Sequence, residues 1–258
     1  MTNAATSERP YLRSLVFFVL CAASTWPLFS ARYLPIQDLP QHLAAIRVLH
    51  SWDDPAFDFA RHFELQLGRT QYLLYYAAAH LLSYVLPLEQ ANLWLVAAAV
   101  FCTPYALRSL LRALGRDERL ALLALPLAYN AHLILGFVNF VWAIVLMLYG
   151  LSLAVWQRRA PSNGRALGLS LVLLACFYAH VVPFSLLGLG VVLVSIDTDL
   201  RASVRRLLPT LPAAFASLLW LWRSPAGQAT LTAASGRPRC VSPCSIQPSA
   251  CGPTCPTG

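Results

Sequence analysis

The sequence predicts an all-α fold: a polytopic membrane helix bundle of about eight spans, with a juxtamembrane helix after the first span. Its composition is the first indication, because 58% of the 258 residues are hydrophobic and only 12% are charged, whereas soluble domains carry about 25% charged residues. The mean hydropathy of +0.58 agrees with this. The third indication is that apolar runs long enough to approach or cross a hydrocarbon layer about 30 Å thick recur along the chain.

These runs divide a predicted transmembrane domain, residues 1–223, into eight segments. They cover residues 11–30, 70–86, 91–107, 120–135, 137–156, 166–182, 184–196 and 207–222. Several are shorter than the twenty or so residues that a perpendicular span prefers, so we expect some to be re-entrant or only partly inserted. The first run follows Arg9 and Arg13 and lacks a cleavage site of small residues, which favours a membrane anchor over a cleaved signal peptide.

The charged residues also indicate a membrane protein. All 19 basic residues are arginine, and the formal net charge is +8. They lie in short clusters between the apolar runs, as membrane topology rules expect, so the predicted partners are membrane lipids and no nucleic acid. The predicted location is the cell inner membrane, with multiple passes.

The side of the membrane on which each loop lies depends on how many segments cross. If all of them cross, the arginine clusters at 108–119, 158–165 and 201–206 share one side with the polar loop 31–69, and the N-terminal arginines lie opposite. The positive-inside rule then makes the polar loop cytoplasmic. One segment that fails to cross reverses this assignment.

The tail, residues 224–258, consists mostly of small residues, Pro and Cys. It has almost nothing to bury, so we expect it to be disordered. Its pairs Cys240/Cys244 and Cys251/Cys255 are compatible with a zinc site, but their spacing is wide and apolar residues are missing around them. A tail read out of frame, which would leave the membrane domain truncated, is an equally open interpretation.

The polar loop 31–69 contains the most informative stretch, "QDLPQHLA", which begins at Gln37. Asp38 precedes a Leu-Pro pair, and Pro is tolerated in the first turn of a helix, so Asp38 is a candidate N-cap. Apolar residues recur at helical spacing from residue 39 to 52 and predict a helix lying in the membrane interface. His42 then stands one turn from Asp38.

Two interpretations of this pair are open. In the first, Asp38 only caps the helix, while His42, Arg47 and His50 contact water or lipid headgroups. In the second, Asp38 is a general base beside the membrane, and His42 tunes it or helps to hold a metal or phosphate.

Polar residues also interrupt the later apolar runs: Asn130, His132, Asn139 and His180. Because polar groups are costly in hydrocarbon, we expect them to face the bundle interior, either as functional groups or in interhelical hydrogen bonds. His180 precedes Pro183 by three residues, where a helix is expected to break and to border a wet cavity. We expect His180 to line the same cavity as Asp38.

The layout of one span, a long loop with an acidic motif and an interfacial helix, and then many spans resembles the glycosyltransferases of the C superfold. These are membrane transferases that use polyprenyl-phosphate sugars. Locally, "QDLPQHLA", "GFVNF" (136–140) and "FYAHVVPF" (177–184) resemble a group of bacterial multi-pass proteins associated with that superfold. The resemblance covers roughly residues 10–200.

The resemblance implies that the protein moves a sugar from a polyprenyl-phosphate donor to an extracytoplasmic acceptor, with Asp38 as the base. It therefore opposes the positive-inside assignment, and we follow the resemblance. His42 would assist Asp38, and Asn139 and His180 would shape the substrate pocket. A phosphate donor needs cations near the cavity mouth, and the arginines of the polar loop suit this because their fork binds phosphate oxygens. They are Arg47, Arg61 and Arg69.

The sequence departs from the superfold in one respect. The superfold often has two adjacent acidic residues in this loop, whereas Asp38 stands alone and Asp53 and Asp54 are a helix away. No cofactor is therefore predicted, and metal-dependent chemistry is in doubt. The alternatives are a non-catalytic multi-pass protein, either a transporter or an envelope-assembly partner, and an inactive truncated fragment.

Overall fold

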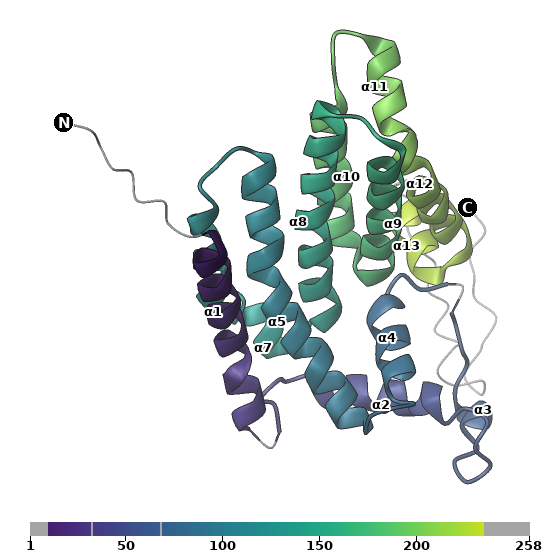
Figure 1. Cartoon of the computed structure of the whole chain (residues 1–258). Coiled ribbons are helices and arrows are strands. Elements are labelled where there is room, and N and C mark those ends of the chain that lie inside the picture. Colours follow the sequence, from purple (N-terminus) through teal and green to yellow (C-terminus); the bar gives the residue numbers. More distant parts are fainter. Residues whose placement is uncertain (1–9, 32, 68, 235–258) are drawn as a thin grey trace, which may run out of the picture.

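The computed structural model describes residues 10–31, 33–67 and 69–234, and every element in these ranges is helical (Figure 1). Three of the described helices are long and apolar enough to cross a membrane: α1 (Pro10–Ser30), α5 (Leu88–Ala113) and α8 (Val138–Arg159). The all-helical fold is thus confirmed for the described residues, and the three candidate spans fit a membrane protein. The number of about eight spans stays a prediction, because the other predicted segments form shorter helices.

Three of these shorter segments follow their predicted positions. They form α9 (Asn163–Ala179), α10 (Val181–Ser195) and α12 (Leu211–Arg223). Between α10 and α12 the chain forms α11 (Leu200–Leu207) and the short 3₁₀ helix η2 (Leu208–Thr210). The close approach of α8 and α10 requires small residues, since a Cβ on Gly150 would lie 2.7 Å from Leu187 Cδ1.

The helical domain also extends beyond the boundary predicted at residue 223. Residues 225–234, expected to be disordered, form α13 (Pro225–Ala234), which packs on α12. The buried Ser224 starts this helix, because its Oγ accepts a hydrogen bond of 2.8 Å from the backbone N–H of Gly227. The four tail cysteines and their zinc interpretation lie outside the described residues.

The predicted segments 70–86 and 120–135 differ most from straight spans. The first contains only α4 (Leu74–Leu82), which packs on α2 (Leu39–His50) and α5. The second is broken into η1 (Glu118–Leu123), α6 (Ala124–Leu127) and α7 (Ala131–Leu135). The break before α7 has a local cause: the Asn130 side chain accepts a hydrogen bond of 3.1 Å from Leu133 N–H and so begins a new helix.

Helices α1 and α5 are antiparallel. Phe17 packs on Tyr105 with ring centroids 4.9 Å apart, and Phe29 packs on Trp94 at 5.0 Å. The start of α1 therefore lies beside the end of α5, and the guanidinium of Arg108 stacks 4.7 Å from the Phe17 ring.

Because α4 is short, the connection between α1 and α5 begins and ends at one end of the bundle, where Figure 1 shows α2 and α3 (Phe59–His62). The links that follow α5, α8 and α10 lie at the other end (Figure 1). This corrects the placement of the polar loop with the arginine clusters, and of Arg13 opposite them. Arg9 lies outside the described residues. That placement required every segment to cross.

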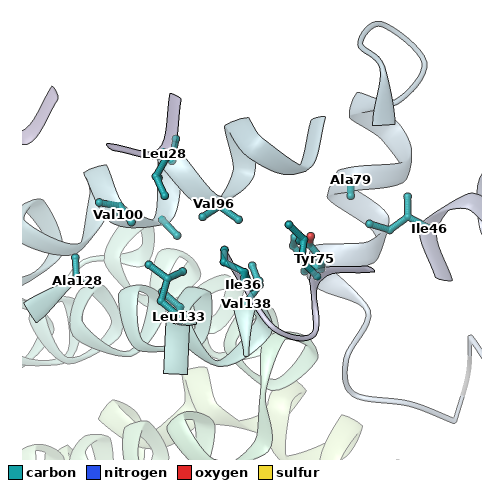
Figure 2. Close-up of a cluster of buried hydrophobic side chains, with 14 of the residues drawn as sticks. Leu28, Ile36, Ile46, Tyr75, Ala79, Val96, Val100, Ala128, Leu133 and Val138 are labelled. Atoms are coloured by element: carbon teal, nitrogen blue, oxygen red, sulfur yellow. The ribbon is translucent and has the colours of Figure 1, made fainter. Parts of the chain in front are cut away.

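A cluster of buried hydrophobic side chains joins α1, α2 and α4 to α8 near the α2 end of the bundle (Figure 2). Ile46 of α2, Tyr75 of α4 and Val96 of α5 are among its most buried members. Within it the Tyr75 hydroxyl donates to the Oδ1 of the buried Asn92. This hydrogen bond and the apolar contacts hold α2 and α4 against the longer helices, and so position the site described next.

Candidate functional site

Asp38 is fixed by its backbone and not by its side chain. Its backbone N–H donates to Leu135 O at 3.2 Å, and that of Gln37 donates to Ile134 O at 3.0 Å. Asp38 occupies the N-cap position of α2, but its carboxylate accepts no capping hydrogen bond. Among the described residues this carboxylate has no hydrogen bond or ion pair, so the interpretation of Asp38 as a mere cap loses its main support.

Gly136 ends α7 and packs directly on Asp38. Its φ of +100° lies in the left-handed region. A Cβ at this position would lie 2.8 Å from both the Cβ and the backbone N of Asp38. Only glycine therefore fits here, both for its backbone conformation and for the space that it leaves.

His42 links three segments with both of its ring nitrogens. Nε2 lies 2.8 Å from Gly136 O, and because a carbonyl only accepts, this nitrogen carries the proton. Nδ1 lies 2.7 Å from the Tyr76 hydroxyl, which donates to it. In this arrangement His42 has no nitrogen left for a metal or a proton transfer, and we regard it as a positioning residue.

The side chains of Asp38 and His42 border a cavity of about 730 Å³, here called the Asp38 cavity. Each of the three stretches singled out in the sequence contributes to its wall: Gln41 comes from "QDLPQHLA", Phe140 from "GFVNF" and His180 from "FYAHVVPF". Tyr72, Tyr76 and several leucines complete the lining. Segments that are far apart in the chain thus meet at one hollow near the ends of α2, α7 and α9.

Asn139 belongs to the cavity wall and has an unpaired amide oxygen. The residue lines the cavity and is only 6% exposed. Its Oδ1 is buried and has no hydrogen-bond partner in the described part of the chain. Buried amide oxygens are nearly always paired, so this one indicates a ligand that donates a hydrogen bond. The interhelical hydrogen bond expected as its alternative role does not occupy this atom.

His180 lies at the break between α9 and α10, as the spacing to Pro183 predicted. Its Nδ1 accepts a hydrogen bond of 3.2 Å from Val182 N–H, so in the neutral ring Nε2 is the donor. The imidazole packs against Tyr72 and Phe140, with ring centroids 5.2 and 5.1 Å away. The structure thus places His180 at the same cavity as Asp38.

The three predicted phosphate-binding arginines are not among the residues that line the cavity. Arg47 is two residues past the lining residue Ala45, about 200° around α2, and so faces away. Arg61 is exposed on α3. Arg69 is also exposed, and Thr70, which follows it, lines the cavity. The three arginines therefore lie outside the lining, and their role near the cavity mouth stays a prediction. Of the three, Arg69 is next in sequence to a lining residue, Thr70.

The sequence interpretation missed Tyr72 and Tyr76. Their spacing of four residues, one helical turn, was the available signal, but it lies in a run that was interpreted as a span. His132 and Asn130, the other polar candidates, do not line the cavity: His132 stacks on Phe140 at 4.5 Å, and Asn130 caps α7. The described residues contain no group of three or more His, Cys, Asp or Glu side chains that would hold a metal ion.

Comparisons of the chain with protein family models, curated proteins and solved structures find no match. The functional argument therefore depends on the cavity itself. It combines an unpaired carboxylate, a buried amide oxygen and an imidazole donor within a mostly apolar wall.

Proposed function

We propose that the protein is an integral-membrane glycosyltransferase-like protein that moves a sugar from a polyprenyl-phosphate donor to an extracytoplasmic acceptor. One observation carries the proposal: Asp38, whose carboxylate has no partner among the described residues, lines the same cavity as Asn139 and His180. Sugar transfer needs a base beside the reacting hydroxyl and polar groups that orient the sugar. The cavity holds both kinds of group.

In the proposed reaction, Asp38 accepts the proton of the acceptor hydroxyl as its oxygen attacks C1 of the sugar. The bond from C1 to the phosphate oxygen breaks, and its electron pair leaves with the polyprenyl phosphate. Asn139 Oδ1 accepts a hydrogen bond from a sugar hydroxyl, and His180 Nε2–H donates one. His42 keeps Asp38 in place through its hydrogen bond to Gly136.

The apolar part of the cavity suits a donor carried on a lipid. Leu65, Leu67 and Phe137 belong to its lining and are 38%, 50% and 46% exposed. Exposed apolar side chains beside a cavity give an isoprenoid chain a surface to lie on. We assign the donor phosphate to Arg69, whose guanidinium suits phosphate oxygens.

The arrangement of the helices supports an extracytoplasmic cavity. Arg108, Arg112, Arg158 and Arg206 belong to the clusters at the end opposite α2 (Figure 1). The Arg158 guanidinium donates to Val194 O at 2.6 Å, so α8 and α10 end together there. The positive-inside rule places this end in the cytoplasm. In an inner membrane with multiple passes, the Asp38 cavity then opens on the outer face.

The test replaces Asp38 with Asn in the full chain reconstituted in lipid vesicles. The probes are radiolabelled short-chain polyprenyl-phosphate sugars, and the measurement is the release of polyprenyl phosphate. We expect Asp38→Asn to lower the rate by about 10²–10⁴-fold with donor binding retained. The matched control is Asp53→Asn, an exposed carboxylate of the same loop outside the cavity, which should keep full activity.

Two results would contradict the proposal. Full activity of Asp38→Asn would show that Asp38 is not the base. A wild-type protein that binds the donors but releases no polyprenyl phosphate would favour the non-catalytic alternative, a transporter or an assembly partner, in which a broken helix and a polar cavity serve binding alone.

A further inference from the structure

A second cavity, of about 930 Å³, lies at the opposite end of α1 and α5 from the Asp38 cavity. We call it the arginine cavity. Its lining includes five arginines and two carboxylates: Arg13, Arg108, Arg112, Arg116, Arg119, Asp117 and Glu118. Five positive charges against two negative ones leave a net charge of +3 in the wall. No step of the proposed sugar transfer uses this cavity.

The two carboxylates hold the two arginines of α5 more closely than Arg116 and Arg119, which follow this helix. Glu118 pairs with Arg108 and Arg112 at 2.7 and 2.8 Å. Asp117 reaches Arg119 only at 4.0 Å, and the Arg119 side chain is 73% exposed. Arg116 is exposed and forms no ion pair with a described residue. Because Glu118 pairs with Arg108 and Arg112, their guanidinium groups are held beside the exposed Arg116 and Arg119.

The other wall of the cavity is apolar and belongs to α1. Leu12, Val16 and Leu20 recur every four residues and therefore form a stripe along one face of the helix. They are 59%, 49% and 39% exposed. Since α1 is a candidate membrane span, this stripe continues from the arginines towards the hydrocarbon layer.

We infer that the arginine cavity binds an anionic phospholipid, with the headgroup phosphate among the arginines and an acyl chain along the stripe of α1. Guanidinium groups bind phosphate oxygens through paired, charge-assisted hydrogen bonds. Basic pockets between helices at the cytoplasmic side are suited to anionic headgroups. A soluble phosphate would satisfy the arginines alone, whereas a lipid also covers the exposed stripe.

The test uses the purified full chain in detergent and measures lipid binding by native mass spectrometry during titration with phosphatidylglycerol. The variant Arg116→Gln/Arg119→Gln removes the two arginines that Glu118 does not hold. Each arginine near an anionic surface contributes a factor of about five in affinity, so we expect binding to weaken about 25-fold. The matched control, Arg159→Gln/Arg201→Gln, removes the same charge at the same end but outside the Asp38 cavity and the arginine cavity.

Two further arms identify the ligand. Phosphatidylcholine should bind far more weakly than phosphatidylglycerol, because its headgroup has no net charge. Glycerol 3-phosphate, which offers the phosphate without the acyl chains, should not compete at equal concentration. Competition by glycerol 3-phosphate would assign the cavity to a soluble phosphate and overturn the lipid proposal. Equal loss of binding in the control pair would overturn it too, since charge alone would then explain the binding.

Discussion

Gly136 and Asp38 touch so closely that a methyl group on Gly136 would lie 2.8 Å from the Cβ of Asp38. The two residues come from different parts of the chain, at the end of α7 and the start of α2. Their contact is reinforced on both sides, by the hydrogen bond from Asp38 N–H to Leu135 O and by that from His42 to Gly136 O. The carboxylate at the cavity is thus held in place through its own main chain.

This contact predicts that Gly136→Ala displaces Asp38 and abolishes the proposed transferase activity. The substitution introduces a left-handed Ala, at about 1–2 kcal/mol, and an overlap with Asp38 that adds about 1–3 kcal/mol. Gly115→Ala is the matched control, because Gly115 also has a positive φ, +66°, but no atom within 4 Å of its added Cβ. Thermal unfolding should show Gly136→Ala as the less stable variant. Equal stability and activity of the two variants would contradict the close contact.

Much of the site could be predicted from the sequence. "QDLPQHLA", "GFVNF" and "FYAHVVPF" combine polar residues with apolar surroundings, and polar residues there face the interior of the bundle. Because a polar side chain is costly in lipid, these residues turn towards the protein, and in the structure each stretch contributes to the wall of the Asp38 cavity. The role of His42 could not be predicted, because its partners, Gly136 and Tyr76, come from segments whose distance from Asp38 depends on the fold.

Tyr75 and Asn92 provide a test of how α4 is held. Tyr75→Phe removes the hydroxyl that donates to Asn92 Oδ1 and leaves that oxygen buried without a partner. We expect a loss of about 1–3 kcal/mol in the free energy of unfolding. Adding Asn92→Leu removes the orphaned oxygen and should restore part of that loss. A double variant that loses the sum of both single effects would show that the two side chains do not interact.

The path of the chain through the membrane was the hardest feature to predict. Residues 70–86 have the apolar composition of a span, but the structure forms only α4 there, since α4 buries Tyr75 and Ala79 against α2 and α5. Composition records that a side chain is apolar and not whether protein or lipid covers it. The common side of the three arginine clusters was predicted from the sequence. The position of the polar loop at the other end was not, because it depends on this one segment.

Glu118 predicts a pH dependence at the arginine cavity. The hydrogen bond from Arg112, together with that from Arg108, lowers the pKa of Glu118 from its usual 4.5 to about 2. Because the folded-state pKa is depressed, its contribution to stability is present above about pH 4.5 and is lost as the pH falls towards 2. The side chain is 34% exposed, so we expect less than about 1 kcal/mol.

Thermal midpoints measured from pH 7 to pH 3 check this prediction. The difference in thermal midpoint between the wild type and Glu118→Gln should shrink as the pH falls. Protonation removes the carboxylate charge of Glu118 in the wild type at low pH, whereas the substitution removes it at every pH. Asp197, whose pKa is also lowered to about 2, chiefly by its hydrogen bond from Arg206, is retained in both proteins. A difference that stays constant with pH would show that the carboxylate charge does not contribute.

The common end of the arginine clusters predicts which face of the membrane each loop occupies. Gln37 lies beside the Asp38 cavity, and Asn163 lies at the opposite end, next to Arg165; both are exposed. In a chain whose four tail cysteines and partly exposed Cys102 are replaced by Ser, Gln37→Cys should react with a membrane-impermeant maleimide in intact cells. Asn163→Cys should react only after permeabilisation. Cys21 and Cys176 are fully buried and give little background.

The labelling also tests the orientation of the bundle in the membrane separately from the proposed function. If both introduced cysteines are labelled from outside, α8 does not cross the membrane between them, and the bundle lies on the surface. If only Asn163→Cys is labelled, the bundle crosses in the reverse sense, and the Asp38 cavity faces the cytoplasm. A base at position 38 would then act on a cytoplasmic acceptor, and the arginines would lie on the outer face, against the positive-inside rule.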